Sequence, residues 1–444
     1  MLGPLTPIPS FVHASLAGDI PDTALETMRL CALDWAYCGL AVADEDSGIP
    51  VAMADYARHC GAGPASVFWT SNVIQHGGAH RLAARDAALI NGTLGHALDV
   101  DDTHFAHIGH VSTVVLPAAM AVAEMKGRSF DDVIMAARIG AEVAVRVGLW
   151  LGRSHYQAGW HQTATSGAYG AAVAATCLLA EDAVEPKVTS AILNVAGMAG
   201  GLKAQFGSPM KPVNAGLAAS QGVEAAFLAH SGQGLSGSTD VLDAVLATQA
   251  GEGNADAFDT LGQAWLFDTV SHKYHACCHG THAMLEALTA LNLPRSAQVD
   301  RIDITTHPRW MTVCNKPAPT TWLEGKFSYR FLAAMYLDGQ DSFGAGPTLY
   351  FPIPPHVQST MDRTNVAADE TMAETSCAVA VTLRDGTRHD GFYDLQRPET
   401  LDQRRDRLVQ KGRALLHPTL AQEVAAAVSA RDMAAFTRAI RQTA

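Results

Sequence analysis

The stretch Asp99–His110 reads Asp-Val-Asp-Asp-Thr-His-Phe-Ala-His-Ile-Gly-His, so three carboxylates and three imidazoles fall within one short segment. An Ala-rich apolar run over residues 81–98 precedes it, and a second apolar run over residues 111–124 follows it. Both runs have the spacing of helices. A titratable segment between two apolar helices does not fold alone, because its charges need partners once they leave water. We therefore expect Asp99–His110 to line a cleft that later segments complete.

The composition limits the classes of protein to consider. A chain of 444 residues that is 48% hydrophobic has enough material for a large core and, we expect, two domains. The formal net charge of -13 argues against a nucleic-acid partner, since phosphate backbones bind clustered lysine and arginine. No uninterrupted apolar run approaches the roughly twenty residues that a membrane helix needs, so we expect no membrane span.

The cysteines and the first residues bear on the compartment. Eight cysteines are scattered through the chain, mostly among apolar residues, which indicates reduced thiols rather than a disulfide framework. Residues 1–21 lack a basic start followed by a long apolar run, so we expect no secretory signal. Residues 1–20 are Pro-rich, and we expect an irregular arm there. Together these features predict a cytoplasmic protein.

The pattern along the chain predicts a mainly α protein, with a large all-helical domain and a smaller α+β lid domain. Runs of Ala, Val, Leu and Gly at helical spacing predict the all-helical domain over 1–267. Alternation in Val299–Thr306 and Cys377–Leu383, with Asp385-Gly386 as a hairpin turn, predicts the α+β domain over 268–396. We expect the charged amphipathic helices of 397–444 to return to the helical domain.

Three further segments carry candidate site residues. His161 lies at the predicted start of a Gly- and Ala-rich helix, where an acid or base would meet the positive end of the helix dipole. Lys211 lies between two prolines, so we expect a rigid loop that holds a cation for a carboxylate. Lys273 opens a stretch with four histidines and two cysteines. Each residue also has an ordinary interpretation, as a cap, a packed core group or an exposed lysine.

The histidines leave a metal site open as an alternative. His104, His107 and His110 recur at intervals of three, and His275 and His279 share a helical i, i+4 spacing. Imidazole and carboxylate groups bind transition metals, so a metal-dependent hydrolase stays a remote alternative. The helical His-Glu-x-x-His signature of zinc proteases is missing from the sequence.

Five motifs, taken in order, resemble the MmgE/PrpD family, which includes 2-methylcitrate dehydratase, cis-aconitate decarboxylase and iminodisuccinate epimerase. The resemblance covers nearly the whole chain. The motifs are Asn91-Gly92 with Asp99-x-Asp-Asp-Thr and His110, Gly159-Trp160-His161-x-Thr163, Phe206-Gly207-Ser208-x-Met210-Lys211-Pro212, Lys273 before a Cys/His-rich helix, and Gly325-Lys326-Phe327-Ser328.

The resemblance implies a homodimer with a cofactor-free, metal-free site between the two domains. Carried over position by position, it implies a site made of Asp99, Thr103, His110, His161, Lys211 and Lys273. We expect catalytic roles for Asp99, His110, His161, Lys211 and Lys273. We expect substrate contacts from Thr103, Thr163 and the two lysines.

The reaction that the resemblance implies is that of a lyase acting on a small di- or tricarboxylate. We expect dehydratase-like chemistry, by proton transfer at a carbon next to a carboxylate. A dicarboxylate isomerase or epimerase, a cis-aconitate-type decarboxylase and a non-catalytic carboxylate-binding dimer stay open. Two departures count against the decarboxylase: the segment from Thr103 to His110 is about one residue longer, and residues 313–317 lack the tyrosine that decarboxylases carry there.

Overall fold

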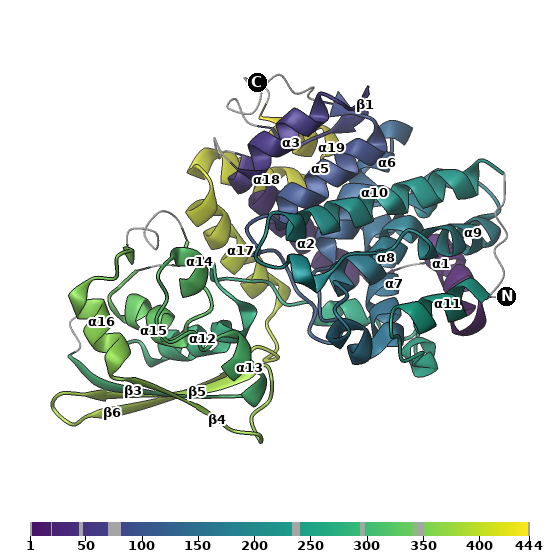
Figure 1. Cartoon of the computed structure of the whole chain (residues 1–444). Coiled ribbons are helices and arrows are strands. Elements are labelled where there is room, and N and C mark those ends of the chain that lie inside the picture. The colour runs from purple at the N-terminus through teal and green to yellow at the C-terminus, as the bar shows by residue number, and fades with distance from the viewer. Residues whose placement is uncertain are drawn as a thin grey trace. The chain divides into compact units, whose positions relative to one another are not determined.

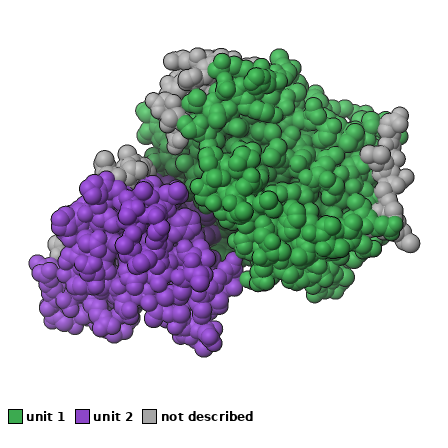
Figure 2. Space-filling model, in the orientation of Figure 1, with its two compact units in different colours: residues 1–272, 404–444 green, residues 273–403 purple. Residues whose placement is uncertain are grey.

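A computed structural model of the chain describes residues 2–18, 20–43, 48–69, 81–232, 240–293, 298–340, 342–343 and 350–442. The chain divides into two compact units, shown as a ribbon in Figure 1 and in separate colours in Figure 2. Unit 1 comprises residues 1–272 and 404–444, and unit 2 comprises residues 273–403. The expected domain boundaries were 267/268 and 396/397. Residues 271 and 272 belong to unit 1 because Ser271 exchanges backbone hydrogen bonds with Thr103, and His272 lies 3.2 Å from Asp34.

Unit 1 consists mainly of helices. Its α-helices are α1 (Pro7–Ala17), α2 (Asp22–Ala43), α3 (Ile49–Ala57), α5 (Ala84–His96), α6 (Ser112–Lys126), α7 (Phe130–Gln157), α8 (Gln162–Leu179), α9 (Val184–Ala196), α10 (Met210–His230), α11 (Asp240–Thr248), α17 (Leu401–Leu415, from residue 404), α18 (Pro418–Ala430) and α19 (Met433–Arg441). Short 3-10 helices add Gly3–Leu5, Lys203–Gln205, Ala255–Phe258 and Leu266–Thr269.

Two expectations about unit 1 were wrong. The Pro-rich start is helical rather than irregular, because Pro7 occupies the first turn of α1, where a missing N–H costs no hydrogen bond. The first domain is also not all-helical. Strand β1 (Ala62–Ser66) pairs antiparallel with β2 (Arg81–Leu82), so residues 81–82 are strand and α5 begins only at Ala84.

Small residues let the central helices of unit 1 approach closely. Helix α8 packs against α6, α7, α9 and α10, and nearly all of its residues are buried (Figure 1). Where α7 crosses α8, a Cβ added to Gly140 would lie 2.5 Å from the Gly170 carbonyl oxygen, and one added to Gly170 would lie 2.5 Å from the Gly140 oxygen. This contact requires glycine on both helices, because any side chain would push the backbones apart.

Unit 2 is a four-stranded sheet with helices. Its strands are β3 (Val299–Thr306), β4 (Thr364–Ala368), β5 (Ser376–Leu383) and β6 (Arg388–Asp394), in the order β4-β3-β5-β6. Its helices are α12 (His282–Leu291), α13 (Pro308–Val313), α14 (Trp322–Gly325), α15 (Tyr329–Leu337), α16 (Pro355–Asp362) and a 3-10 turn (His279–Thr281).

The alternation of apolar and polar residues along its strands explains why this part of the chain forms a sheet. Ile302 and Ile304 are buried in β3, which pairs antiparallel with β5 and parallel with β4. Helix α12 packs on β5 and β6. The mainly α fold with a smaller α+β domain is confirmed, as are the strands predicted at Val299–Thr306 and Cys377–Leu383, whereas β4 was not predicted. Among the described helices, none combines the length and the apolar character needed to cross a bilayer.

Replacing Gly170 by alanine should destabilise unit 1. The new methyl group would overlap the Gly140 carbonyl oxygen and Ala144, and overpacking of this kind costs about 1–3 kcal/mol. Thermal unfolding should show a clearly lower Tm. Gly197→Ala is the matched control, because its added Cβ meets nothing within 4 Å and its backbone is already right-handed, so its Tm should stay close to that of the parent. Equal Tm values for the two variants would contradict this account of the α7–α8 contact.

Candidate active site

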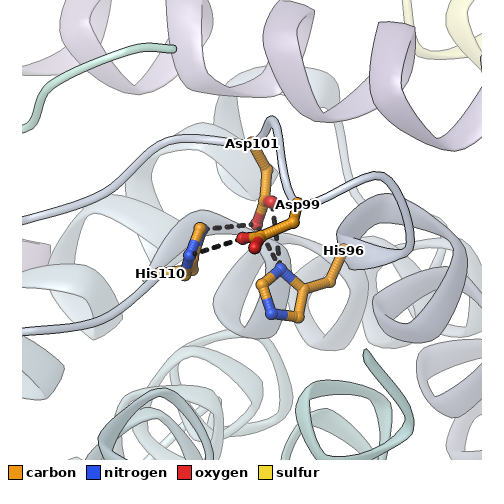
Figure 3. Close-up of side chains that lie close together, drawn as sticks. All are labelled: His96, Asp99, Asp101 and His110. Atoms are coloured by element: carbon orange, nitrogen blue, oxygen red, sulfur yellow. Dashed lines mark hydrogen bonds and ion pairs between the residues drawn. The ribbon is translucent and has the colours of Figure 1, made fainter. Parts of the chain in front are cut away.

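The Asp101 carboxylate lies between two imidazoles, as Figure 3 shows. His96 Nδ1 is 2.9 Å from both Asp101 oxygens, and His110 Nδ1 is 3.1 Å from Oδ2. The two imidazole rings meet edge to face at 4.4 Å. All three residues are buried. His96 ends α5, while Asp101 and His110 belong to the segment between α5 and α6, so the segment's charges fold back onto the helix that precedes it.

Asp99 connects this group to Lys211. Its Oδ1 lies 3.3 Å from His110 Nε2 and 2.8 Å from Lys211 Nζ. Asp99 has φ of 58°, a left-handed conformation that aspartate tolerates better than most residues. The result is an unbroken series of close contacts from Lys211 through Asp99, His110 and Asp101 to His96.

His161 lies on the same side of unit 1. It is the N-cap residue of α8, but its side chain makes no capping hydrogen bond. Its ring stacks 6.2 Å from His96 and meets Phe206 edge to face at 4.8 Å. Lys211 Nζ is 5.3 Å from the Phe206 ring. Because the Phe206 ring contacts both residues, it sets the spacing between the imidazole and the ammonium.

We had expected Lys211 to lie in a rigid loop, but it lies in a helix. It is the second residue of α10, and Pro209 is the N-cap. A proline just before the helix pre-sets the backbone for the first turn, which explains why the Pro-Met-Lys-Pro sequence forms a helix start. Helices α8 and α10 therefore both begin at the candidate site, and their N-termini add partial positive charge to that of Lys211. This arrangement suits an anionic ligand.

Burial and neighbouring charges perturb the titration of this group. Burial alone would raise the pKa of Asp101, but the His110 and His96 imidazoles lower it well below its ordinary value. Burial lowers the pKa of His96 to about 4, although Asp101 acts in the opposite direction. Burial, assisted by His96 and Lys211, also lowers the pKa of His161 well below its ordinary value. In the unliganded protein at neutral pH, His96 and His161 are therefore neutral and Asp101 is ionised.

Residues with no room to move hold His110 in place. The His110 backbone N–H donates to Thr163 Oγ1 at 3.0 Å. A Cβ on Gly109 would lie 2.9 Å from the same oxygen and 2.8 Å from the His107 ring, so only glycine fits there. Ile108 has φ of 58°, which is strained for a β-branched residue. Thr163, expected to contact substrate, thus has a supporting role in the unliganded structure.

The other histidines of the segment face elsewhere. His104 Nε2 lies 2.9 Å from the Leu266 carbonyl oxygen, and His107 Nε2 lies 2.6 Å from Ser166 Oγ. The interval of three therefore does not gather His104, His107 and His110 into a metal site. The His104 ring faces the Leu266 segment, the His107 ring faces α8, and the His110 ring faces Asp99 and Asp101.

A different set of donor atoms could hold a cation. One donor each from His96, Asp99, Asp101 and His110 lies within 4.8 Å of the others. The Lys211 ammonium already contacts Asp99, however, and a second cation at that carboxylate would be repelled. The arrangement is better suited to holding and moving protons than to binding a metal.

Thr103 and Lys273 are the two remaining residues that we expected at the site. Thr103 exchanges two backbone hydrogen bonds of 2.8 Å with Ser271, which places residues 271–272 beside the acidic segment. Lys273 is the first residue of unit 2, so its expected place beside Lys211 stays a prediction. The structure thus brings together Asp99, His110, His161 and Lys211 within unit 1.

The sequence interpretation missed His96 and the role of Asp101. A histidine inside an apolar helix is usually a packed core residue, so His96 drew no attention. The available signal was its position at the end of a buried helix, three residues before Asp99. Only the left-handed turn at Asp99 reverses the chain and brings Asp101 back to His96.

Acidification below pH 6.5 should destabilise the protein through its buried neutral histidines. Burial lowers the pKa of His96 to about 4 and that of His107 to about 3, so between pH 6.5 and those values the unfolded chain takes up protons that the folded chain does not. Each group should therefore cost up to about 1.4 kcal/mol per pH unit as the pH falls from 6.5. The measurement is urea unfolding at pH 7, 6 and 5.

His107→Gln serves as the comparison for this slope. Its free energy of unfolding should depend less steeply on pH than that of the parent, whatever its value at pH 7, because one buried imidazole no longer titrates. Identical slopes in the two proteins would contradict the assignment of His107 as a buried neutral group.

The chain is similar to known proteins over most of its length. Residues 7–251 match the MmgE/PrpD N-terminal domain, and residues 275–433 match the MmgE/PrpD C-terminal domain. The chain is 30% identical over 307 residues to a cis-aconitate decarboxylase-like protein of Aspergillus oryzae, a match covering 64% of this chain and 61% of that protein. It is 27% identical to cis-aconitate decarboxylases of Aspergillus terreus (356 residues; 72% of this chain, 69% of the relative) and Homo sapiens (419 residues; 86% and 82%). The match to the first relative thus spans less than two thirds of its length. The chain belongs to the MmgE/PrpD family.

Proposed function

We propose that this protein is a cofactor-free lyase that acts on a small di- or tricarboxylate. The observation that carries the proposal is the meeting of Lys211, two helix N-termini and the His161 imidazole beside the Asp99–His110–Asp101–His96 relay. Fixed positive charge next to a neutral imidazole suits the binding of a carboxylate and proton transfer at the neighbouring carbon. The family relationship supports the same class of reaction.

The positive charge would act on the developing anion. Removing a proton, or CO2, from a carbon next to a carboxylate leaves an electron pair that spreads into the carboxylate as an enolate. A fixed ammonium such as that of Lys211 stabilises this charge more than it stabilises the substrate, which lowers the barrier. Asp99 keeps the ammonium in place until the substrate arrives.

The imidazoles would handle the protons. The pKa of His161 is lowered by burial and by positive neighbours, and an anionic substrate would raise it again toward neutrality. His161 would then accept or return a proton at the reacting carbon. His110, held between Asp99 and Asp101, would serve as its counterpart, because ionised Asp101 stabilises a positive imidazole.

The same groups serve dehydration and decarboxylation. In dehydration a base takes the proton and an acid protonates the departing hydroxyl, so the products are an alkene and water. In decarboxylation CO2 leaves and the acid protonates the carbon. The names of the relatives make cis-aconitate the first substrate to test. The longer segment before His110, and Val313 and Cys314 where decarboxylases carry a tyrosine, support a different carboxylate.

The reaction can be identified with purified protein in deuterated water. Cis-aconitate and related hydroxy-tricarboxylates and dicarboxylates are each incubated with the enzyme and followed by NMR and mass spectrometry. A lyase should release CO2 or water, whereas an isomerase or epimerase should incorporate deuterium without a change in formula. Activity that survives EDTA would oppose a metal-dependent hydrolase. If no carboxylate is converted and none raises the Tm, the proposal is wrong. The resemblance also leads us to propose a homodimer, which sedimentation tests.

His161→Ala and Lys211→Ala should each lower turnover by a factor on the order of 100 or more, because general acid–base and electrostatic contributions are usually of that size. Steady-state kinetics on the carboxylate identified above gives kcat and KM. A lysine that only anchors the substrate should raise KM, and one that stabilises the enolate should lower kcat.

Lys203→Met is the matched control for the Lys211 variant. Lys203 is a nearby lysine whose ammonium donates to the Tyr156 carbonyl oxygen at 2.9 Å and lies over the Tyr156 ring. Its loss should leave kcat and KM nearly unchanged. Wild-type turnover in both site variants, or an equal loss in the control, would show that the site is misassigned.

A further inference from the structure

A buried lysine from the C-terminal part of unit 1 contacts the backbone of the acidic segment. Lys411, in α17, has a side chain that is only 1% exposed. Its ammonium pairs with the Asp34 carboxylate of α2 and donates to the Val100 carbonyl oxygen at 2.6 Å. Val100 lies between the two aspartates that organise the candidate site, Asp99 and Asp101. One ammonium thus joins α17, α2 and the acidic segment.

The Asp34 carboxylate extends this group toward residue 272. Its Oδ2 is 3.2 Å from His272 Nδ1, and its Oδ1 accepts from the Cys38 thiol at 3.8 Å. Burial alone would raise the pKa of Asp34, yet Lys411 and His272 lower it overall. Burial alone would lower the pKa of Lys411, but Asp34 outweighs it and the pKa is raised. Both groups are therefore charged in the interior.

A gain in folding stability is a weak explanation for the buried ion pair of Lys411 and Asp34. Removing two charges from water costs free energy that their attraction roughly offsets, and apolar replacements are often no less stable. What an apolar pair would not supply is a donor to Val100. That carbonyl needs a fixed donor because the chain turns sharply beside it, through the left-handed Asp99.

The contacts on either side show what the donor fixes. On one side of Val100, Asp99 reaches Lys211 at 2.8 Å. On the other, Asp101 reaches His96 and His110 at 2.9 and 3.1 Å. Further along, Thr103 is held by Ser271, next to His272. A shift of about 1 Å at Val100 would break contacts on both sides, and displacements of that size cost large factors in rate.

We propose that Lys411 and Asp34 are positioning residues that hold the Val100 carbonyl, and thereby set the geometry of the Asp99–His110–Asp101–His96 relay. The inference rests on the proposed function for its effect on turnover. Its effect on the relay is a separate, structural claim. The same group holds His272, so it also fixes the residue from which the chain continues to Lys273.

The test uses the full chain with both charges removed. Lys411→Met alone would leave Asp34 charged without its ammonium and endanger folding, so the main variant is Asp34→Asn combined with Lys411→Met. The asparagine keeps an oxygen near His272. Tyr37→Phe is the matched control, because the Tyr37 hydroxyl also ties α2 to the C-terminal part of unit 1, donating to the Ala421 carbonyl oxygen at 3.0 Å. Within the described residues, its hydroxyl makes no hydrogen bond to the acidic segment.

The first readout needs no substrate. NMR of histidine labelled with 15N follows the ring nitrogens of His96 and His110 across pH, and hydrogen exchange follows the Asp99 and Thr103 amides, which donate to the His96 and Ser271 carbonyl oxygens. In the double variant, both imidazole titrations should shift and the two amides should exchange at least tenfold faster. Tyr37→Phe should lower the Tm slightly and change neither.

The second readout is kcat and KM on the carboxylate converted by the parent protein, with cis-aconitate as the first choice. The double variant should lose roughly tenfold or more in kcat, and KM should change less. Unchanged titrations and exchange in the double variant would overturn the proposal, as would equal changes in Tyr37→Phe. If the parent converts no carboxylate, the proposed function fails, while the NMR and exchange data still decide whether Lys411 and Asp34 position the relay.

Discussion

The buried Asp101 carboxylate is the constraint on which the site depends. An anion removed from water is costly unless charged or hydrogen-bonding groups surround it, and here two imidazoles do so. Satisfying both at once requires the chain to leave α5, turn through a left-handed residue and return to the same helix end. Asp99 is thereby directed to Lys211, and His110 is held between two carboxylates. Once the position of Asp101 is fixed, these neighbours have little freedom.

The close packing of the helices in the core allows this arrangement. Glycine and alanine at the helix crossings let α5, α6, α8 and α10 pack side by side, so that several helix ends meet within one region. At the start of a helix the first backbone N–H groups lack intrahelical partners, and a cation such as Lys211 can be held in place there. The site is therefore a product of helix termini and of the segments that join them. The middles of the helices supply the packing that keeps these termini in place.

Family membership and substrate identity are separate questions for this chain. The scaffold and the acidic segment are those of the MmgE/PrpD family, whose domains match both parts of the sequence. Residues 313–317 belong to unit 2, where Val313 is exposed and Cys314 is buried with its sulfur 3.2 Å from that of Cys278. The phenol of a tyrosine within residues 313–317 would donate a hydrogen bond, and neither the Val313 nor the Cys314 side chain replaces it well. The proposed selectivity for a different carboxylate rests in part on these two positions.

The periodicity of the sequence was sufficient for most of the fold. The apolar run over residues 111–124 corresponds to α6 (Ser112–Lys126), and the alternation over Val299–Thr306 matches the bounds of β3, because helices and strands bury one face at a fixed repeat. The sequence also singled out Asp99, His110, His161 and Lys211, since unusual residue types stand out in an Ala-rich chain.

Tertiary structure alone decided how those residues work. His96 is indistinguishable from a core histidine until the turn at Asp99 brings Asp101 back to it. Lys411 is one charge among many in an amphipathic helix until folding places its ammonium on the Val100 carbonyl, 311 residues away in sequence. Local sequence cannot encode such contacts, because the partner of a buried charge is set by which segments pack together, and that depends on the whole chain.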